Sequence, residues 1–135
     1  MDLLKQLKIT RVKAGQSSAG TEVDSDSVDM AGFDGVIFIG SIATANAGNY
    51  MKVQGSDDNS TFSDLEGTKV VPGDDGDQAK IEIHRPRHRY LRAVIIRAGA
   101  NTATGDIYAI QHSTSKAPIT NDDAETHISP AAGTA

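Results

Sequence analysis

Two histidines and the residues between them form a pattern that invites interpretation as a metal site. His84 and His88 are four residues apart, but Pro86 lies between them and excludes an ordinary helix. In an extended chain the two rings would point to the same side, next to arginines whose positive charge disfavours a cation. The other two histidines, His112 and His127, have no partner at ligand spacing. The sequence therefore predicts no metal site.

Two Asp-rich segments offer carboxylate oxygens of the kind that calcium binds. They are residues 73–77 (Gly-Asp-Asp-Gly-Asp) and residues 57–59 (Asp-Asp-Asn). Neither segment has the EF-hand spacing of alternating oxygen ligands, a central glycine and a final bidentate glutamate. Asp, Asn and Gly are also the residues that tight turns require. We therefore interpret both segments as turns.

Motifs for nucleophilic catalysis and phosphate binding are missing from the sequence. Ser41 follows Gly40, but the second glycine of a nucleophile elbow is lacking. No glycine-containing segment ends in the Gly-Lys-Ser/Thr of a phosphate-binding loop. The chain has no cysteine, which excludes a thiolate nucleophile, a thiolate metal site and a disulfide framework. Nothing in the sequence supports an enzyme.

The composition limits both the size of the core and the kind of partner. The 135 residues are enough for one domain, and a hydrophobic fraction of 38% with only 4% aromatic residues predicts a small core. The 13 Lys and Arg residues against 18 Asp and Glu give a net charge of -5, which opposes binding to nucleic-acid phosphates. No segment has the apolar length of a transmembrane span or a signal peptide. We expect neither a nucleic acid nor a membrane as partner.

The elements that must position the candidate side chains discussed above are short apolar segments. Clusters of Gly, Asp, Asn and Ser separate these segments. The alternation of apolar and polar residues at 51–53 and 81–83 predicts strands with one buried face. Residues 36–39 and 90–96 are apolar on both faces, so a loop, an arm or another subunit should cover the second face. The sequence predicts an all-β antiparallel sandwich of about seven to nine strands.

Both ends of the chain have the composition of arms that extend from such a sandwich. Leu3, Leu4 and Leu7 are spaced for one helical face, but two turns of helix are marginal in isolation. Neither end carries enough apolar residues to offset its own ordering entropy, so contacts with neighbouring subunits should order both. The predicted divisions are an N-terminal arm at 1–20, a sandwich domain at 21–116 and a C-terminal arm at 117–135. The apolar residues expected at subunit contacts are Leu3, Leu4, Leu7, Ile119 and Ile128.

Five arginines fall in one short stretch of the chain, namely Arg85, Arg87, Arg89, Arg92 and Arg97. Residues 22–77, by contrast, carry many acids and only Lys52 and Lys69 as bases. One interpretation is that a basic patch on one subunit docks on an acidic patch of the next. Pairing between adjacent strands of a single chain is the alternative, and the sequence does not choose between them. In the first interpretation the residues at the interface are Arg89, Arg92 and Arg97.

Four segments between residues 24 and 118 carry a family resemblance. They are Val28–Ile39 (Val-Asp-Met-Ala-Gly-Phe-Asp-Gly-Val-Ile-Phe-Ile), Lys52–Asp58, Asp64–Thr68, and Arg85-Pro86 followed by Arg89–Arg92. In this order they cover most of the chain. The chain resembles the head decoration (cement) proteins of tailed bacteriophages.

The resemblance implies a jelly-roll-like β-sandwich that binds the outside of an icosahedral capsid and reinforces contacts between capsomers. It implies the major capsid protein as partner, self-association as a homotrimer, no enzymatic activity and no cofactor. Two alternatives stay open. One is another virion component, such as a head–tail joining protein. The other is a carbohydrate-binding sandwich, which would need exposed aromatic side chains to stack on sugar rings.

Overall fold

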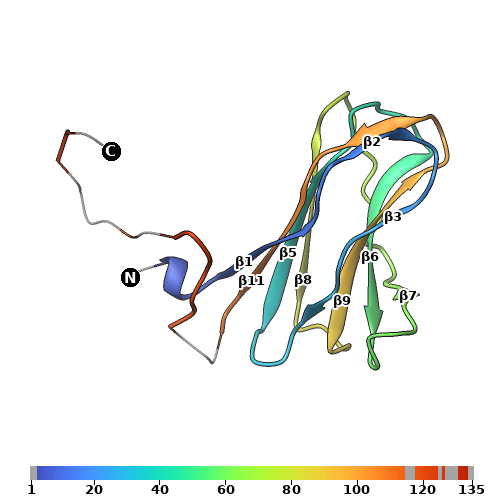
Figure 1. Cartoon of the computed structure of the whole chain (residues 1–135). Helices are drawn as coiled ribbons and strands as arrows, with labels where there is room; N and C mark the ends of the chain where they lie inside the picture. The colour runs from blue at the N-terminus through green and yellow to red at the C-terminus, as the bar shows by residue number, and fades with distance from the viewer. Residues whose placement is uncertain (1–2, 115–117, 125, 127–130, 134–135) are drawn as a thin grey trace.

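Two antiparallel sheets, packed face to face, form the body of the protein (Figure 1). The computed structural model describes residues 3–114, 118–124, 126 and 131–133. The predicted all-β antiparallel sandwich is confirmed. Its jelly-roll topology, which only the resemblance implies, stays a prediction. Within the described residues no helix has both the length and the apolarity that crossing a membrane requires.

The first sheet, called here the β5 sheet, has four strands in the order β1-β11-β5-β8. Their bounds are β1 Lys8–Lys13, β5 Gly35–Ser41, β8 Gln78–His84 and β11 Ile107–His112. Phe38 pairs with Ala109 on one side and Ile81 on the other, and all three side chains are buried between the sheets. Because side chains alternate along a strand, Ile37 and Ile39 lie on the opposite, outer face.

The second sheet, called here the β9 sheet, is built around β9 and β6. Its strands are β3 Val23–Asp24, β4 Val28–Asp29, β6 Asn49–Ser56, β7 Ser63–Asp64 and β9 Tyr90–Arg97. A separate two-stranded ladder pairs β2 Gln16–Ala19 with β10 Thr102–Thr104. The described residues form eleven strands, more than the predicted seven to nine. The excess arises because β3, β4 and β7 have two residues each, too few to leave a periodic pattern in sequence.

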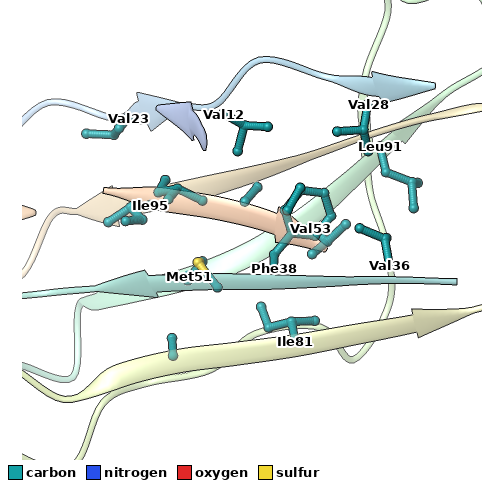
Figure 2. Packing of buried hydrophobic residues seen from close by; sticks show 14 of the residues in the cluster. Val12, Val23, Val28, Val36, Phe38, Met51, Val53, Ile81, Leu91 and Ile95 are labelled. Carbon is teal, nitrogen blue, oxygen red and sulfur yellow. The ribbon is translucent and has the colours of Figure 1, made fainter. Parts of the chain in front are cut away.

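The core lies between the two sheets and consists mainly of aliphatic side chains (Figure 2). Phe38 contributes the one aromatic ring among its fully buried members, in agreement with the low aromatic content. The predicted alternation is present, since Met51, Val53 and Ile81 are buried while Lys52 points outward. A small aliphatic core of this kind depends on close packing rather than on a few large rings.

The sandwich begins at Lys8, earlier than the boundary after residue 20 that composition predicts. β1 pairs with β11 from Lys8 to Lys13, and Val12 is buried in the core. β1 has the sequence Lys-Ile-Thr-Arg-Val-Lys and lies at the edge of its sheet, so it contains no apolar run that marks it as a strand. The N-terminal arm is therefore short and contains a 3-10 turn, η1 (Leu3–Lys5).

Candidate binding surfaces

The two arms lie beside one another and extend away from the sandwich (Figure 1). η1 buries no side chain, and Leu3 is 58% exposed. Leu4, Leu7 and Ile119 are half-buried, and Leu4 and Ile119 line the same hollow of about 200 Å³. We call Leu3, Leu4, Leu7 and Ile119 the arm tip. Ile128, the fifth apolar residue predicted at a contact, lies outside the described residues.

Asn121 joins the two arms through its side-chain amide. Its Nδ2 donates to the carbonyl oxygens of Leu4 at 2.9 Å and Leu7 at 2.8 Å. Its Oδ1 accepts from the backbone N–H of Ile9 at 2.8 Å, on the edge of β1. The arms therefore contact each other within one chain, and the order that neighbouring subunits should give them stays a prediction. The sequence offered no signal for this role, because a single Asn in a polar segment looks like any turn residue.

We predict that replacing Asn121 with alanine releases the arms without unfolding the sandwich. The N–H of Ile9 loses its acceptor and two arm carbonyls lose their donor, so the amides of Ile9 and Ile119 should exchange with solvent at least about tenfold faster. The amide of Phe38, inside the β5 sheet, should be unaffected. Hydrogen exchange followed by NMR measures both. Asn101→Ala, at an exposed turn before β10, is the matched control; equal arm exchange in the two variants would contradict the role of Asn121.

Arg89 forms an ion pair within its own chain. Its Nε and Nη2 donate to the two carboxylate oxygens of Asp29 at 3.0 and 2.9 Å. This fork geometry is the strongest form of an Arg–carboxylate pair, and the Asp29 hydrogen bond raises the pKa of Arg89. The guanidinium also lies 5.2 Å from the centre of the Tyr90 ring. Because both residues of the pair are exposed, the pair fixes β4 against β9 more than it stabilises the fold.

Arg92 belongs to a network of polar side chains on the outer face of the β9 sheet. It donates to Gln54 Oε1 from two nitrogens, at 2.9 and 2.8 Å, and its guanidinium lies 4.2 Å from the centre of the Phe62 ring. Asp24 Oδ2 is 3.7 Å from Arg92 Nη1. Val94, on the same face, is fully buried. The cover that the sequence predicts for the second face of β9 thus comes from side chains of the same chain.

An ion pair between Lys52 and Asp64 continues this network. Lys52 Nζ donates to Asp64 at 2.9 Å, and Gln54 Nε2 donates to the same carboxylate at 2.8 Å. The Lys52 hydrogen bond lowers the pKa of Asp64, and the same bond raises the pKa of Lys52. Both groups therefore stay charged over the neutral range.

Arg97 is buried and donates to the backbone of its own chain. Arg97 is the last residue of β9 and is only 5% exposed. Its donors reach the carbonyl oxygens of Thr21 at 2.7 Å and of Ser17 and Thr102 at 2.9 Å, together with Thr21 Oγ1 at 3.0 Å. Arg97 thus ties β2, the segment before β3 and β10 to the end of β9. The structure brings all three predicted interface arginines into intramolecular contacts, which favours the alternative of pairing within one chain.

The outer face of the β5 sheet carries a patch of apolar side chains. Ile9 is 38% exposed and Tyr108 is 41% exposed, and their neighbours on this face are half-exposed. We call Ile9, Ile37, Ile39, Tyr108 and Ile110 the outer apolar face. The apolar pattern of residues 36–39 predicts a cover for the second face of this strand. In a single chain this face remains accessible to solvent, unlike that of β9.

The Asp-rich loops cap their own turns. Asp58 accepts hydrogen bonds from the N–H groups of Ser60 and Thr61, both at 2.9 Å, and from Ser56 Oγ at 2.8 Å. The hydrogen bond from Thr61, together with the others, lowers the pKa of Asp58. In residues 73–77, Asp77 Oδ2 accepts from the N–H of Asp74 at 3.1 Å, and Asp75 accepts from the N–H of Ala45, in another loop, at 2.7 Å. These contacts agree with the interpretation of both segments as turns.

Two of the described histidines, His84 and His112, lie together at one end of the β5 sheet, and His127 lies outside the described residues. His112 Nε2 lies 3.0 Å from Glu82 Oε2, and its ring centre is 6.4 Å from that of His84. The His112 ring lies over Gly35, where a Cβ would come within 2.4 Å of it, so a side chain there would displace the ring. His88 contacts Asp57 at 3.0 Å instead. Throughout the described ranges no three His, Asp or Glu side chains are placed to hold a metal ion.

Several aromatic rings that a sugar could stack on are occupied by cations. Lys69 Nζ lies 4.2 Å from the centre of the Tyr50 ring, and Arg92 and Arg89 occupy the rings of Phe62 and Tyr90 as described above. Phe38 is buried in the core. A stacking platform for carbohydrate needs accessible ring faces. Tyr108, by contrast, is 41% exposed, so the carbohydrate-binding alternative stays open.

Two solved structures have a similar fold. The PBSX exported protein XepA matches with a TM-score of 0.61 and 13% identity, over 97% of this chain and 45% of that protein. The SPBc2 prophage-derived protein YomS matches with a TM-score of 0.52 and 9% identity, over 79% of this chain and 93% of that protein. The chain thus spans less than half the length of the first. At these identities the similarity is one of fold. No protein-family model matches the sequence, and no curated protein matches it either.

Proposed function

We propose that this protein is a structural component of a bacteriophage particle, specifically a decoration protein that binds the outer surface of the capsid. The observation that carries the proposal is the arm tip, an apolar group held outside the sandwich by a defined set of hydrogen bonds. The similar folds of two prophage proteins support a phage origin. In this role the protein has no enzymatic activity and no cofactor, and its partner is the major capsid protein.

The geometry supports docking through the arms. An exposed apolar tip on a rigid body can enter a groove of a partner, and burying one leucine side chain contributes about 1.5–3 kcal/mol. Asn121 holds the tip in one conformation before binding, which lowers the entropic cost of docking. Many copies on one shell would each contribute a modest contact, reinforcing joints between capsomers. The homotrimer implied by the resemblance stays a prediction for the bound state.

The proposal is tested by the location and occupancy of the protein on purified phage particles. Quantitative mass spectrometry gives the copy number, and electron cryo-microscopy gives the position. We expect a copy number in proportion to the capsid protein and density on the outer shell. The triple variant Leu3→Ser, Leu4→Ser, Leu7→Ser should bind particles that lack the protein at least about tenfold more weakly.

The control for this experiment is Val71→Ser, which removes an apolar side chain that is 43% exposed on the sandwich, away from the arms. This variant should bind as the parent does. A few copies confined to the junction of head and tail would instead support a head–tail joining protein. Absence of the protein from the particles would overturn the proposal altogether.

A further inference from the structure

The outer apolar face of the β5 sheet is continuous across three neighbouring strands. In the ladder, Ile9 pairs with Ile110, which pairs with Ile37. In the next row of the same face, Tyr108 pairs with Ile39. Two adjacent rows of the sheet thus present apolar side chains outward. The corresponding face of the β9 sheet carries the Arg92 and Lys52 network instead, so the two outer faces of the sandwich differ in chemistry.

The size of this face limits what can cover it. The whole outer face of the four strands, which have six or seven residues each, measures roughly 400 Å² at about 4.8 Å between strands and about 3.3 Å per residue. The two apolar rows on three of the strands take up about half of it, and apolar patches on monomers are often functional. Two such faces in contact would bury about 800 Å² in total, less than a standard permanent interface. The expected contact is therefore weak and concentration-dependent.

Charges at the edge of the face determine which arrangement two copies can adopt. β8 places Glu82 in the row of Ile37 and Lys80 in the row of Ile39. A two-fold axis in the plane of the sheet and perpendicular to its strands exchanges these two rows. Glu82 of one copy then lies opposite Lys80 of the other, and the reverse pair forms as well. An axis parallel to the strands would place Lys80 opposite Arg11 of the other copy, bringing like charges together.

The opposite edge of the face does not choose between the two arrangements. Arg11 pairs with Tyr108 in the ladder, so the perpendicular axis places Arg11 of the second copy over Ile9. A hollow of about 740 Å³ lies at this edge, and its lining contains Asp122 and Asp123 but also Lys8 and Arg11. The two carboxylates are balanced by two bases, so the choice of axis rests on the Lys80–Glu82 edge.

We propose that the outer apolar face is a two-fold contact with a second copy of this chain. The two β5 sheets pack face to face with antiparallel strands, Ile37 opposite Ile39, and reciprocal Lys80–Glu82 pairs at the β8 edge. The contact uses none of the residues of the arm tip, so it neither needs nor excludes binding to a particle. The solution mass of the purified protein tests it separately from the proposed function.

Sedimentation equilibrium of the full chain and of four variants provides the test. The parent should show a reversible monomer–dimer equilibrium at concentrations up to about 1 mM. Lys80→Glu and Glu82→Lys should each weaken the dimer about tenfold, because each replaces two attractions with two repulsions. The double variant that carries both changes should regain the parent's affinity, since the pairs are re-formed with opposite sign. Ile39→Lys should abolish the dimer.

Arg87→Glu is the matched control for Lys80→Glu, because it makes the same change in net charge at an exposed loop residue outside the face. It should dimerise like the parent. Circular dichroism of each variant verifies the fold. A parent that is monomeric throughout or forms a trimer would overturn the proposal. So would a dimer that tolerates Ile39→Lys, or a double variant that fails to recover.

Discussion

Replacing Arg97 with methionine should lower the free energy of unfolding by about 3 kcal/mol or more. The guanidinium makes charge-assisted hydrogen bonds to three backbone carbonyls and a hydroxyl in a site that is only 5% exposed. Methionine has similar length but no donor, so the buried carbonyl of Thr102 would lose its partner, as would the carbonyls of the exposed residues Ser17 and Thr21. Since a domain is stable by only about 5–15 kcal/mol, this is a large fraction of the total. Urea denaturation followed by circular dichroism measures it.

Two further variants separate this effect from a simple loss of charge. Arg97→Lys keeps the charge but cannot reproduce the planar fork of donors, so it should recover only a small part of the loss. Arg87→Met removes a charge at an exposed position and should change stability by less than about 0.5 kcal/mol. If Arg97→Met were as stable as Arg87→Met, Arg97 would not be the internal tie that its contacts indicate.

Replacing Phe38 with alanine should cost about 3–5 kcal/mol, comparable to or larger than the loss at Arg97. Phe38 is 0% exposed and lies between Ala109 and Ile81 in the centre of the β5 sheet (Figure 2). Phe38 is the one aromatic ring in a core of close-packed aliphatic side chains, and close packing limits how far these can move into the cavity. Thermal and urea unfolding both report the change.

Ile39→Ala, one position further along the same strand, is the matched control. The side chain of Ile39 points to the opposite side of the sheet from that of Phe38. It lies on the outer apolar face and is partly exposed in the single chain. Its truncation should cost about 1 kcal/mol, since part of its surface is already in water. It should nevertheless weaken the proposed dimer. Equal losses at Phe38 and Ile39 in dilute protein would mean that the outer face is covered within the chain.

The local pattern of the sequence predicted much of the fold but little of the binding surfaces. The alternation at 51–53 and 81–83 has a period of two, so it identifies which residues of β6 and β8 enter the core. The apolar runs at 36–39 and 90–96 were recognised as strands with two apolar faces. Their second faces differ, because Val94 is covered by the chain's own polar side chains whereas Ile37 and Ile39 are not. No feature of the two runs distinguishes these outcomes.

Strand period, turn composition and net charge are properties of neighbouring residues, so the sequence by itself determined the all-β class, the turns and the small aliphatic core. The partners of the polar side chains were decided only by the tertiary structure. Asp29 and Arg89 are 60 positions apart, Thr21 and Arg97 are 76 apart, and Ile9 and Asn121 are 112 apart. Contacts over such distances depend on strand order and register, which arise when the whole chain packs and every buried polar group must find a partner. The same packing placed the arms side by side and left one outer face of the sandwich apolar.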